Sequence, residues 1–521
     1  MKKILFHLLT IVTLSVAAVS CGGTDDPKNN EQEKEQKKSS AAELSSFYLK
    51  KVSNSTLTDD IEAYIASGNV LKFSIPEATD PKTLVPILNI SAKATAYINE
   101  TPYESGKSYD FSKSTIIKVV SESGEVTRNY TVQWENGDNF MDSYIYQLMD
   151  KCNIPGISFA VMKGSTVVYN KGFGYANKAT GERVTPDHLF RMASISKQFC
   201  TLCIMMLKEE GKLSLDDKVF GDKGILKGLF HNLTPYHEQI TVRQLLSHSS
   251  GICAGLDDPA FTSSYRYYNG NKSTPVPTDT LIQRTINKRQ QPYVNSSGAT
   301  YSPGALYNYS NVGFCILHRI VEVVSGKEYE KYLQEDVLAK MGVYDTHVGG
   351  YENQRLKNEC VFYSQGGGDG YANPLHELAG AAGIITSTTQ MMRVLTYIDG
   401  RDDVPDIFSK QTLSEMYTPF SYASNSSYKT YGLGWRMNNS KRFYGSHFHG
   451  GNIAGTATMW VGGATGDALG DYPDIMSGAI ICNSRSYDDE LTWSTSWGTS
   501  SSNDIDDSFY IILGEAFRHF M

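Results

Sequence analysis

A serine and a lysine three residues apart, at the start of an apolar run, constrain this chain more than any other feature. Ser194 and Lys197 open a helical pattern that continues to Glu210, where Gly211 provides a C-terminal stop. On a helix these two positions share a face, so the amine lies beside the hydroxyl. If the helix begins at Ser194, free backbone N–H groups and the positive end of the helix dipole also favour an anion there.

The chemistry suggested by this pair is nucleophilic catalysis. A serine hydroxyl is a weak nucleophile until a neighbouring base takes its proton, and a lysine is such a base only where its surroundings lower its pKa. Ser-x-x-Lys alone is a weak signal in a chain of 521 residues, since an ordinary helix start with an exposed lysine gives the same pattern. Other motifs in the sequence are needed to distinguish a catalytic pair from an ordinary helix start.

The N-terminal residues carry targeting features. Lys2-Lys3 precedes an apolar run from Ile4 to Leu14, which is typical of a secretory signal. The following Ala18-Val19-Ser20-Cys21-Gly22 resembles a bacterial lipobox, in which Cys21 is lipidated and becomes the mature N-terminus. Simple secretion with an incidental cysteine is the alternative. A membrane-spanning helix is disfavoured because the apolar run is shorter than about 20 residues.

Composition places the remaining chain among globular proteins. Residues 22–42 are almost entirely polar, so we expect a solvated tether after a signal segment of residues 1–21. A net charge of -8 without a clustered basic patch argues against a nucleic-acid partner. We expect a lipid-anchored monomer of the cell envelope, attached to the outer membrane on its periplasmic or outer face.

Residues 43–136 predict a small all-β sandwich, because short runs alternate apolar and polar positions between turn residues. The clearest runs are Ser46–Leu49, Val70–Ser74, Ile116–Val120 and Tyr130–Trp134. The segment resembles the immunoglobulin-like modules behind the lipid anchor of many Bacteroidetes-type lipoproteins. It has no clustered catalytic groups, so we interpret it as a spacer, with contact to glycans as the alternative.

Residues 138–521 predict an α+β domain. A helix over Phe140–Cys152 and a hairpin over 156–175 precede Ser194, and a mostly helical stretch reaches about residue 345. The polar, tyrosine-rich segment Gly255–Thr300 interrupts it and suggests a loop or lid. Strands return after about residue 380, and an amphipathic helix, Asp507–Phe520, closes the chain. Strands at both ends indicate an antiparallel sheet flanked by helices, with a helical subdomain beside it.

Five stretches in order resemble the serine β-lactamase and D-alanyl-D-alanine peptidase superfamily, and most of all its class C β-lactamase and esterase branch. They are Ile154–Ser158, Leu189–Lys197, Ile240–Ile252, Pro303–Gly313 and His447–Gly451. The resemblance covers about residues 140–521. It implies the β-lactamase/transpeptidase-like fold and a covalent acyl-enzyme on Ser194.

The resemblance also assigns roles within the site. Tyr309 shares proton transfer with Lys197, and the two are treated as a coupled pair because either could take the proton from Ser194. Asn311 binds Lys197 and the substrate amide. Gly450 and Gly451 let a substrate lie along the strand edge, while the backbone N–H groups of Ser194 and Asn452 form the oxyanion hole.

His449 is the main departure from the family pattern, because it stands where the motif has a lysine. Imidazole is mostly neutral above about pH 6.5, whereas lysine carries a permanent charge for a substrate carboxylate. This favours a peptidase or esterase over an efficient β-lactamase. If a charged His449 holds an anionic group, the KM for a carboxylate substrate should rise between about pH 6 and about pH 8.

The other histidines and the cysteines have structural interpretations. His248 could be a base, but its counterpart in the family is structural, and His447 is expected to be a strand neighbour of the site. Cys200 and Cys203 form a C-x-x-C within the helix after Ser194, which favours buried core thiols over a redox or metal pair. No metal or nucleotide motif is found, so no cofactor is implied.

We therefore predict an envelope serine hydrolase acting on D-amino-acid peptides, β-lactams or small esters and amides, with peptidoglycan-derived peptides among the candidates. A catalytically silent lipoprotein that binds peptidoglycan fragments or peptides is the alternative. A nucleophile with its base has no use in a pure binder, so the motif set argues for the enzyme.

Overall fold

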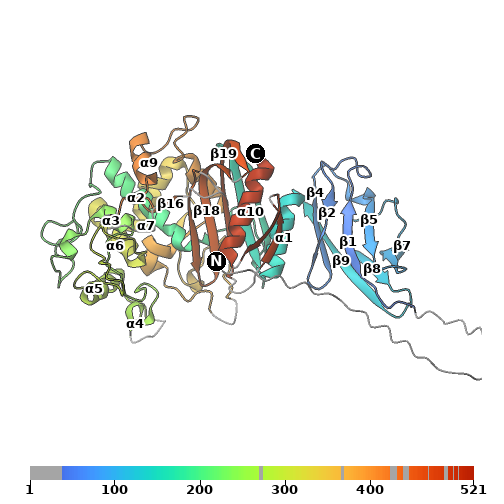
Figure 1. The fold of residues 1–521 in the computed structure, drawn as a ribbon, viewed down its shortest axis with the longest axis horizontal. Coiled ribbons are helices and arrows are strands. Elements are labelled where there is room, and N and C mark those ends of the chain that lie inside the picture. Colours follow the sequence, from blue (N-terminus) through green and yellow to red (C-terminus); the bar gives the residue numbers. More distant parts are fainter. Residues whose placement is uncertain are drawn as a thin grey trace, which may run out of the picture.

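The computed structural model describes residues 38–268, 274–364, 369–422, 431–437, 445–467, 469–485, 491–496, 498–502 and 504–521. The predicted signal segment, Cys21 and most of the predicted tether lie outside the described residues. An all-β module stands at one end of the molecule, a large sheet in the middle and a group of helices at the other end (Figure 1). None of the described helices is long and apolar enough to cross a lipid bilayer.

The N-terminal module is a two-sheet sandwich, in agreement with the predicted all-β region. One sheet has the order β2-β1-β5 and the other β3-β4-β9-β8-β6-β7, with β4 and β9 parallel. Its core centres on three mutually contacting rings, Phe47, Phe73 and Phe111. The strands are β1 (Leu44–Leu49), β2 (Ile61–Glu62), β3 (Tyr64–Ala66), β4 (Val70–Ile75), β5 (Pro86–Ile90), β6 (Thr95–Ile98), β7 (Thr101–Pro102), β8 (Thr115–Val120) and β9 (Thr127–Asn136).

The central sheet joins segments from both ends of the second half of the chain. Its strand order is β12-β11-β10-β19-β18-β17-β16, and all of its pairs are antiparallel. The pairing of Ala160 with Ala479 brings the early hairpin beside the late strands, as the sequence predicted. The strands are β10 (Gly156–Lys163), β11 (Thr166–Asn177), β12 (Glu182–Arg183), β16 (Arg436–Met437), β17 (His447–Ile453), β18 (Thr456–Asp467) and β19 (Gly470–Cys482).

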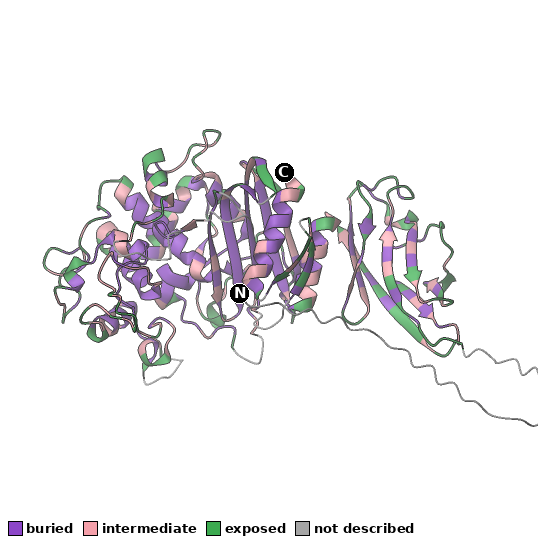
Figure 2. Cartoon of the chain, in the orientation of Figure 1, coloured by how far each residue is buried: buried purple, intermediate pink, exposed green. Residues whose placement is uncertain are grey.

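Helices cover both faces of this sheet, which explains why β10 is buried along nearly its whole length (Figure 2). Ile157, Phe159 and Val161 point to the layer of α1 (Asn139–Lys151) and α10 (Ile505–Phe520). Ala160 and Met162, which alternate with them, point to the layer that contains α2 (Ser196–Glu209). The mixed fold with an antiparallel sheet between helices is the predicted α+β class.

The helical subdomain lies on the α2 side of the sheet (Figure 1). Its helices are α3 (Val242–Leu246), α4 (Ser263–Arg266), α5 (Thr278–Lys288), α6 (Asn311–Ser325), α7 (Tyr329–Tyr332), α8 (Thr388–Thr396) and α9 (Lys410–Tyr417). A small sheet joins β13 (Phe190–Arg191), β15 (Ile384–Thr386) and β14 (His347–Val348). A separate hairpin of β20 (Leu491–Thr495) and β21 (Gly498–Ser502) packs near α10.

Two local predictions were wrong. The segment Gly255–Thr300 is not a patternless loop, since it contains α4 and α5, and the apolar side chains of α5 pack into the main core. Ser194 does not begin the α-helix. It lies in a 3-10 turn, Ala193–Ile195, that leads into α2 at Ser196. Propensity alone does not separate such a tight turn from the first turn of a helix.

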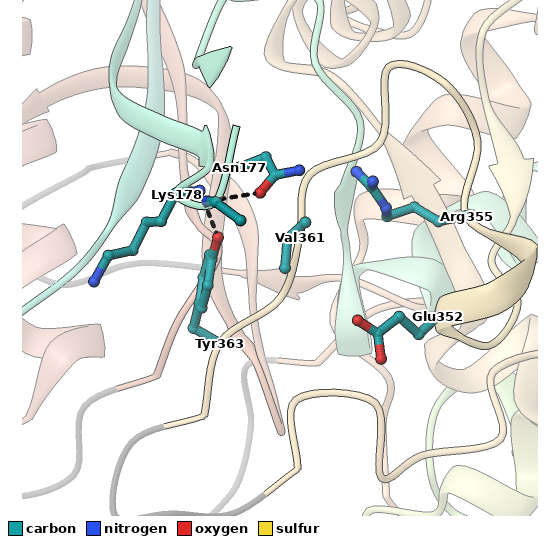
Figure 3. A pocket seen from close by; sticks show the side chains of 7 residues that line it. Asn177, Lys178, Glu352, Arg355, Val361 and Tyr363 are labelled. Carbon is teal, nitrogen blue, oxygen red and sulfur yellow. Dashed lines mark hydrogen bonds between the residues drawn. The ribbon is translucent and has the colours of Figure 1, made fainter. Parts of the chain in front are cut away.

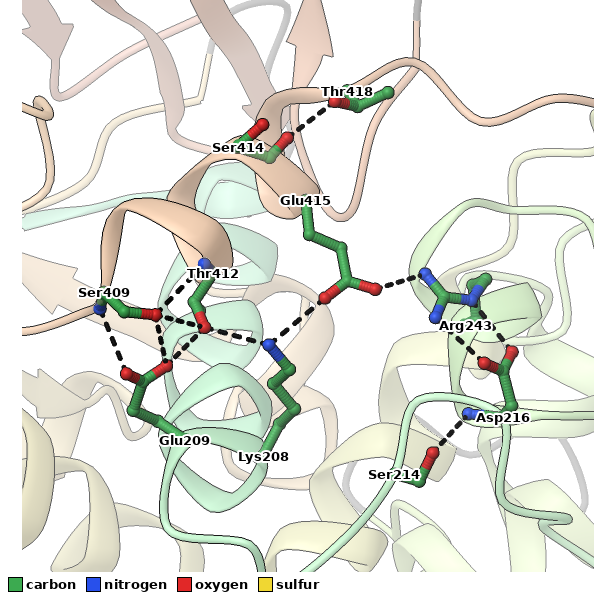
Figure 4. Close-up of polar contacts among 10 residues, drawn as sticks. All are labelled: Lys208, Glu209, Ser214, Asp216, Arg243, Ser409, Thr412, Ser414, Glu415 and Thr418. Atoms are coloured by element: carbon green, nitrogen blue, oxygen red, sulfur yellow. Dashed lines mark hydrogen bonds and ion pairs between the residues drawn. The ribbon is translucent and has the colours of Figure 1, made fainter.

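The far end of α2 is held by a polar network that also joins α3 and α9 (Figure 4). Glu209 accepts hydrogen bonds from Ser409 and Thr412. Lys208 lies 3.2 Å from Glu415, which also pairs with Arg243 at 2.8 Å. Because several partly buried groups share these contacts, the network fixes α2 better than an isolated surface pair would.

Candidate active site

The turn carrying Ser194 is fixed on both sides by hydrogen bonds to the backbone of Ile384. Met192 donates its N–H to the Ile384 carbonyl at 2.9 Å, and Ser196 accepts the Ile384 N–H on its Oγ at 2.9 Å. Between them Ala193 takes a left-handed conformation with φ of 47°, which is uncommon for a residue other than glycine. Strain of this kind persists where the surroundings enforce it, and it often marks a functional site.

Ser194 is the one partly exposed residue in an otherwise buried stretch. Every other residue from His188 to Leu207 is buried. The chain therefore opens to solvent at the hydroxyl that the sequence singled out. A nucleophile needs this access, and a structural serine in a core would not show it.

Lys197 is buried and donates three hydrogen bonds. Its Nζ lies 3.3 Å from Ser194 Oγ, 2.6 Å from Asn311 Oδ1 and 2.7 Å from the carbonyl oxygen of Ala381. Its Nζ also stands over the faces of Tyr309 and Phe314. Within the described ranges, no carboxylate lies within ion-pair distance of this amine.

These three contacts suit an amine that exchanges a proton with Ser194. The amide and carbonyl oxygens of Asn311 and Ala381 can only accept, so they take two hydrogens from Nζ. The remaining position points to Ser194 Oγ. It holds a third hydrogen when the lysine is an ammonium and a lone pair when the lysine is neutral. Both protonation states therefore fit the same geometry.

Tyr309 reaches the site on a loop that His248 holds in place. The His248 carbonyl accepts the Asn308 N–H at 2.7 Å, and its ring lies 4.3 Å from the Tyr309 ring. Lys197 Nζ lies 4.9 Å from the Tyr309 ring centroid. The structure thus brings Tyr309 against the lysine through its ring face.

Asn311 is the first residue of α6, and its neighbour Ser310 caps the helix by accepting the Gly313 N–H. Its amide is oriented from both ends: Oδ1 accepts from Lys197, and Nδ2 donates to Asp258. The lysine donates to the amide oxygen and the aspartate oxygen accepts from the amide nitrogen, so the orientation of the amide is determined. One N–H of Asn311 remains for another partner.

Strand β17 passes directly behind the Ser194 turn. A Cβ added to Gly451 would lie 2.3 Å from the Met192 carbonyl oxygen and 3.2 Å from Ala193 Cβ. Only glycine permits this approach, which brings the next residue, Asn452, to the backbone of the serine turn. Gly450 faces the opposite side of the strand, toward Asp506. The predicted oxyanion pair, Ser194 and Asn452, therefore comes from two neighbouring segments.

His449 is enclosed rather than exposed as a cation. Burial, and then the positive charges of Arg436 and Lys197, hold the pKa of His449 well below its usual value near 6.5. The imidazole stays neutral between pH 6 and pH 8. The structure therefore gives no basis for a charged His449 that holds a substrate carboxylate, and we expect a flat KM profile in that window.

The remaining histidines have structural environments. His248 is fully buried, and burial followed by the nearby positive charge of Lys197 lowers its pKa far below the usual value. His447 stacks on Tyr417 at 3.9 Å and meets Trp435 at 4.9 Å. Burial lowers the pKa of His447 to about 3. Neither ring contacts Ser194.

Three contributors were not found from the sequence. Asp258 lies in the segment that we predicted to be a loop, Ala381 contributes only a backbone carbonyl, and Tyr431 belongs to none of the five family motifs. The acid could have been noticed because it follows the His248 stretch closely. A backbone acceptor leaves no signal in the residue types.

Two other features of the described residues, the thiols of α2 and a surface pocket, do not contribute to this site. Cys200 and Cys203 are both fully buried in α2, and burial raises the pKa of each thiol. An open surface pocket of about 680 Å³ is lined by the residues of Figure 3, among them Lys178, Arg355 and Tyr363. Its Tyr363 hydroxyl accepts the Lys178 N–H at 2.7 Å. None of the predicted site residues lines it.

Known proteins resemble about three fifths of the chain. "Protein flp" from Staphylococcus aureus strain MRSA252 is 26% identical over 316 residues, which cover 60% of this chain and 58% of that protein. A "Putative D-alanyl-D-alanine carboxypeptidase" from Escherichia coli O157:H7 is 25% identical over 371 residues, 61% of this chain and 76% of that protein. The chain thus spans somewhat more than half the length of Protein flp.

Solved structures share the fold. The D-amino acid amidase from Ochrobactrum anthropi SV3, in complex with L-phenylalanine amide, superposes with a TM-score of 0.52 at 20% identity. The match covers 73% of this chain and all of the amidase. Residues 141–472 match the family described as Beta-lactamase. Since this match spans more than half of the chain, the protein belongs to the Beta-lactamase family.

Proposed function

We propose that this protein is a serine hydrolase that cleaves amide or ester substrates through an acyl-enzyme on Ser194. The observation that carries the proposal is the contact of Lys197 Nζ with Ser194 Oγ at 3.3 Å, with Asn311 and Ala381 occupying the other two positions of the amine. Held this way, the amine accepts the hydroxyl proton as the Ser194 oxygen attacks the substrate carbonyl.

The following steps use groups already described. The tetrahedral oxyanion accepts hydrogen bonds from the backbone N–H groups of Ser194 and Asn452. In comparable sites each such donor lowers the activation barrier by about 3 kcal/mol. Lys197, coupled to Tyr309, returns the proton to the leaving amine or alcohol. Water then attacks the acyl carbonyl and gives a proton to the same pair. As the bond between the acyl carbon and Ser194 Oγ breaks, the pair passes this proton to Oγ, which releases the acid and restores the hydroxyl.

We propose D-amino-acid peptides, amides or small esters as substrates, with β-lactams as slow acylating analogues. The relative from Escherichia coli that is named a putative D-alanyl-D-alanine carboxypeptidase supports the peptide class. The neutral His449 supports substrates whose recognition does not depend on a charge at this position. Envelope attachment through Cys21 is part of the proposal. Incorporation of labelled palmitate that is lost in Cys21→Ser tests it.

Turnover of a substrate panel tests the reaction. The panel contains D-Ala-D-Ala peptides, D-amino-acid amides, p-nitrophenyl esters and nitrocefin, assayed with wild type and Ser194→Ala. We expect turnover of at least one amide or ester that Ser194→Ala abolishes, and a KM for the peptide that stays flat from pH 6 to pH 8. Tight binding of the peptides without turnover of any substrate would favour the binding lipoprotein instead.

A further inference from the structure

A chain of hydrogen bonds crosses the floor of the site and connects four separate segments of the sequence. It starts at the backbone N–H of Ser310, which donates to His248 Nδ1 at 3.1 Å. His248 Nε2 lies 3.1 Å from Tyr431 Oη, which lies 3.2 Å from His449 Nε2. His449 Nδ1 lies 2.6 Å from the Gly450 carbonyl oxygen.

The direction of every bond in this chain follows from its ends. A backbone N–H can only donate, so His248 Nδ1 carries a lone pair and the proton of the neutral ring is on Nε2. That proton faces Tyr431 Oη. The single phenol hydrogen of Tyr431 is then available for His449 Nε2. His449 carries its own proton on Nδ1, which faces the Gly450 carbonyl, an obligatory acceptor.

Tyr431 is also held in place by contacts that do not belong to this row of hydrogen bonds. It is fully buried, and its carbonyl accepts the Phe420 N–H at 2.7 Å. The turn that follows it is anchored by Gly434, whose N–H reaches the Leu246 carbonyl at 3.0 Å. A Cβ on Gly434 would collide with Thr201 of α2 at 1.9 Å, so this turn packs directly against the catalytic helix. The phenol therefore has a set position between the two rings.

We propose that Tyr431 is a positioning residue that fixes His449 as a neutral imidazole protonated on Nδ1 and holds it in place relative to His248 and the Tyr309 loop. The proposal rests on the proposed hydrolase function for its kinetic consequence only. Adding a proton to His449 Nε2 would cost the hydrogen bond from Tyr431, and adding one to His248 Nδ1 would oppose the Ser310 N–H. These hydrogen bonds thus disfavour the imidazolium form of both His449 and His248.

The surroundings of His449 act in the same direction. The charged and titratable groups that face it come from every segment packed around it, and none of those described is a carboxylate: Lys197 on α2, Arg436 on β16, Tyr309 and His248 on their loops, and Tyr431. The guanidinium of Arg436, and the amine of Lys197 when it is protonated, oppose a further positive charge on His449. Tyr431 adds orientation to this electrostatic effect.

The test combines tautomer determination with a pH profile on the full-length chain. Imidazole-¹⁵N NMR of the wild type should show His449 protonated on Nδ1 and His248 on Nε2, both unchanged from pH 8 to pH 5. Tyr431→Phe removes only the bridging oxygen. It should lower kcat/KM about tenfold at pH 7, as expected for one lost hydrogen bond, and introduce an ionisation between pH 5 and pH 7.

Tyr422→Phe is the matched control. It removes a hydroxyl that donates to the carbonyl of Ser247, the residue before His248. The hydrogen bonds of the His248 and His449 rings are left in place. Its pH profile should follow the wild type. A wild-type His449 that is protonated on Nε2 or titrates above pH 5 overturns the proposal, and so does a Tyr431→Phe profile that superimposes on the wild type.

The NMR readout needs no turnover, so it remains decisive if Tyr431→Phe does not fold. It also separates this proposal from the proposed function. If Ser194 does not react at all, the proposed hydrolase function is wrong. The NMR spectra still test the proposed tautomers of His248 and His449.

Discussion

At the scale of single residues, the site depends on how few orientations its polar groups can adopt. Lys197 has an acceptor for each of two hydrogens and faces Ser194 with the third position, and Asn311 is held between a donor and an acceptor. This pre-organisation matters because a reacting pair gains rate only when it is already aligned. Asp258, which holds the Asn311 amide from the side opposite Lys197, can therefore be tested directly by substitution.

Asp258→Ala removes the acceptor that orients the Asn311 amide, which then can rotate and release Lys197. We expect kcat to fall about 10- to 100-fold, the range for a lost hydrogen bond to a charged group. Asp258→Asn retains an acceptor oxygen for Asn311 and should lose no more than about fivefold. Steady-state kinetics on the best substrate of the panel measures both. Wild-type activity in Asp258→Ala would show that the amide needs no such support.

Four buried imidazoles should make the protein sensitive to acid. Burial lowers the pKa of His237 to about 4 and of His447 to about 3, and holds those of His248 and His449 well below 6.5. The unfolded chain takes up these protons near pH 6.5 while the folded chain does not. Stability from this source is therefore complete above about pH 6.5 and declines as the pH falls toward 4.

The contribution of one ring can be isolated. Each such imidazole adds about 1.4 kcal/mol per pH unit to the dependence of the free energy of unfolding on pH. His447→Phe should reduce that slope by this amount between pH 6 and pH 4, measured by urea unfolding at several pH values. An unchanged slope would mean that His447 is protonated in the folded protein.

At the scale of elements, the proposed reaction requires the close approach of β17 to the Ser194 turn. Gly451→Ala would place a methyl group 2.3 Å from the Met192 carbonyl and push the strand away from the turn. We expect kcat to fall by about 100-fold or more through loss of the oxyanion donors. The comparison is Gly450→Ala, whose Cβ meets nothing closer than 3.5 Å and should leave the melting temperature near that of the wild type. Comparable activity of Gly451→Ala and wild type would refute this geometry.

The sequence predicted the elements that carry periodic patterns or family motifs. The hairpin of β10 and β11, helix α2 and the C-terminal helix all lie close to their predicted ranges. It failed for the segment containing α4 and α5, where polar residues and tyrosines hide an amphipathic pattern that only packing against α6 reveals. Asp258 was missed for the same reason, since its partner Asn311 comes from a distant segment.

At the scale of the whole molecule, the N-terminal module is joined to the second part by a specific interface. Gly137-Asp138 alone separates β9 from α1. Asp150 of α1 accepts hydrogen bonds from the Tyr64 hydroxyl at 3.0 Å and the Ser67 N–H at 3.1 Å. Ser74 and Tyr146 add a buried hydroxyl contact at 3.0 Å. A short connection together with these polar contacts, one of them buried, indicates a fixed orientation rather than a swinging linker.

Asp150→Ala should uncouple the two parts, because it leaves the Tyr64 and Ser67 donors without their acceptor. We expect calorimetry to show a separate transition, several degrees lower, for the N-terminal module. Asp110→Ala removes a carboxylate that binds only within the module, at Ser112, and provides the control. A single unshifted transition in Asp150→Ala would show that this contact does not join the two parts.

The proposed reaction requires that Ser194 is a nucleophile made reactive by Lys197. Incubation with a fluorescent penicillin or a fluorophosphonate, followed by mass spectrometry of the digested protein, tests it most directly. We expect a covalent adduct on the peptide containing Ser194, absent in Ser194→Ala and formed much more slowly in Lys197→Ala. No adduct with either probe, or an adduct on another residue, would contradict it.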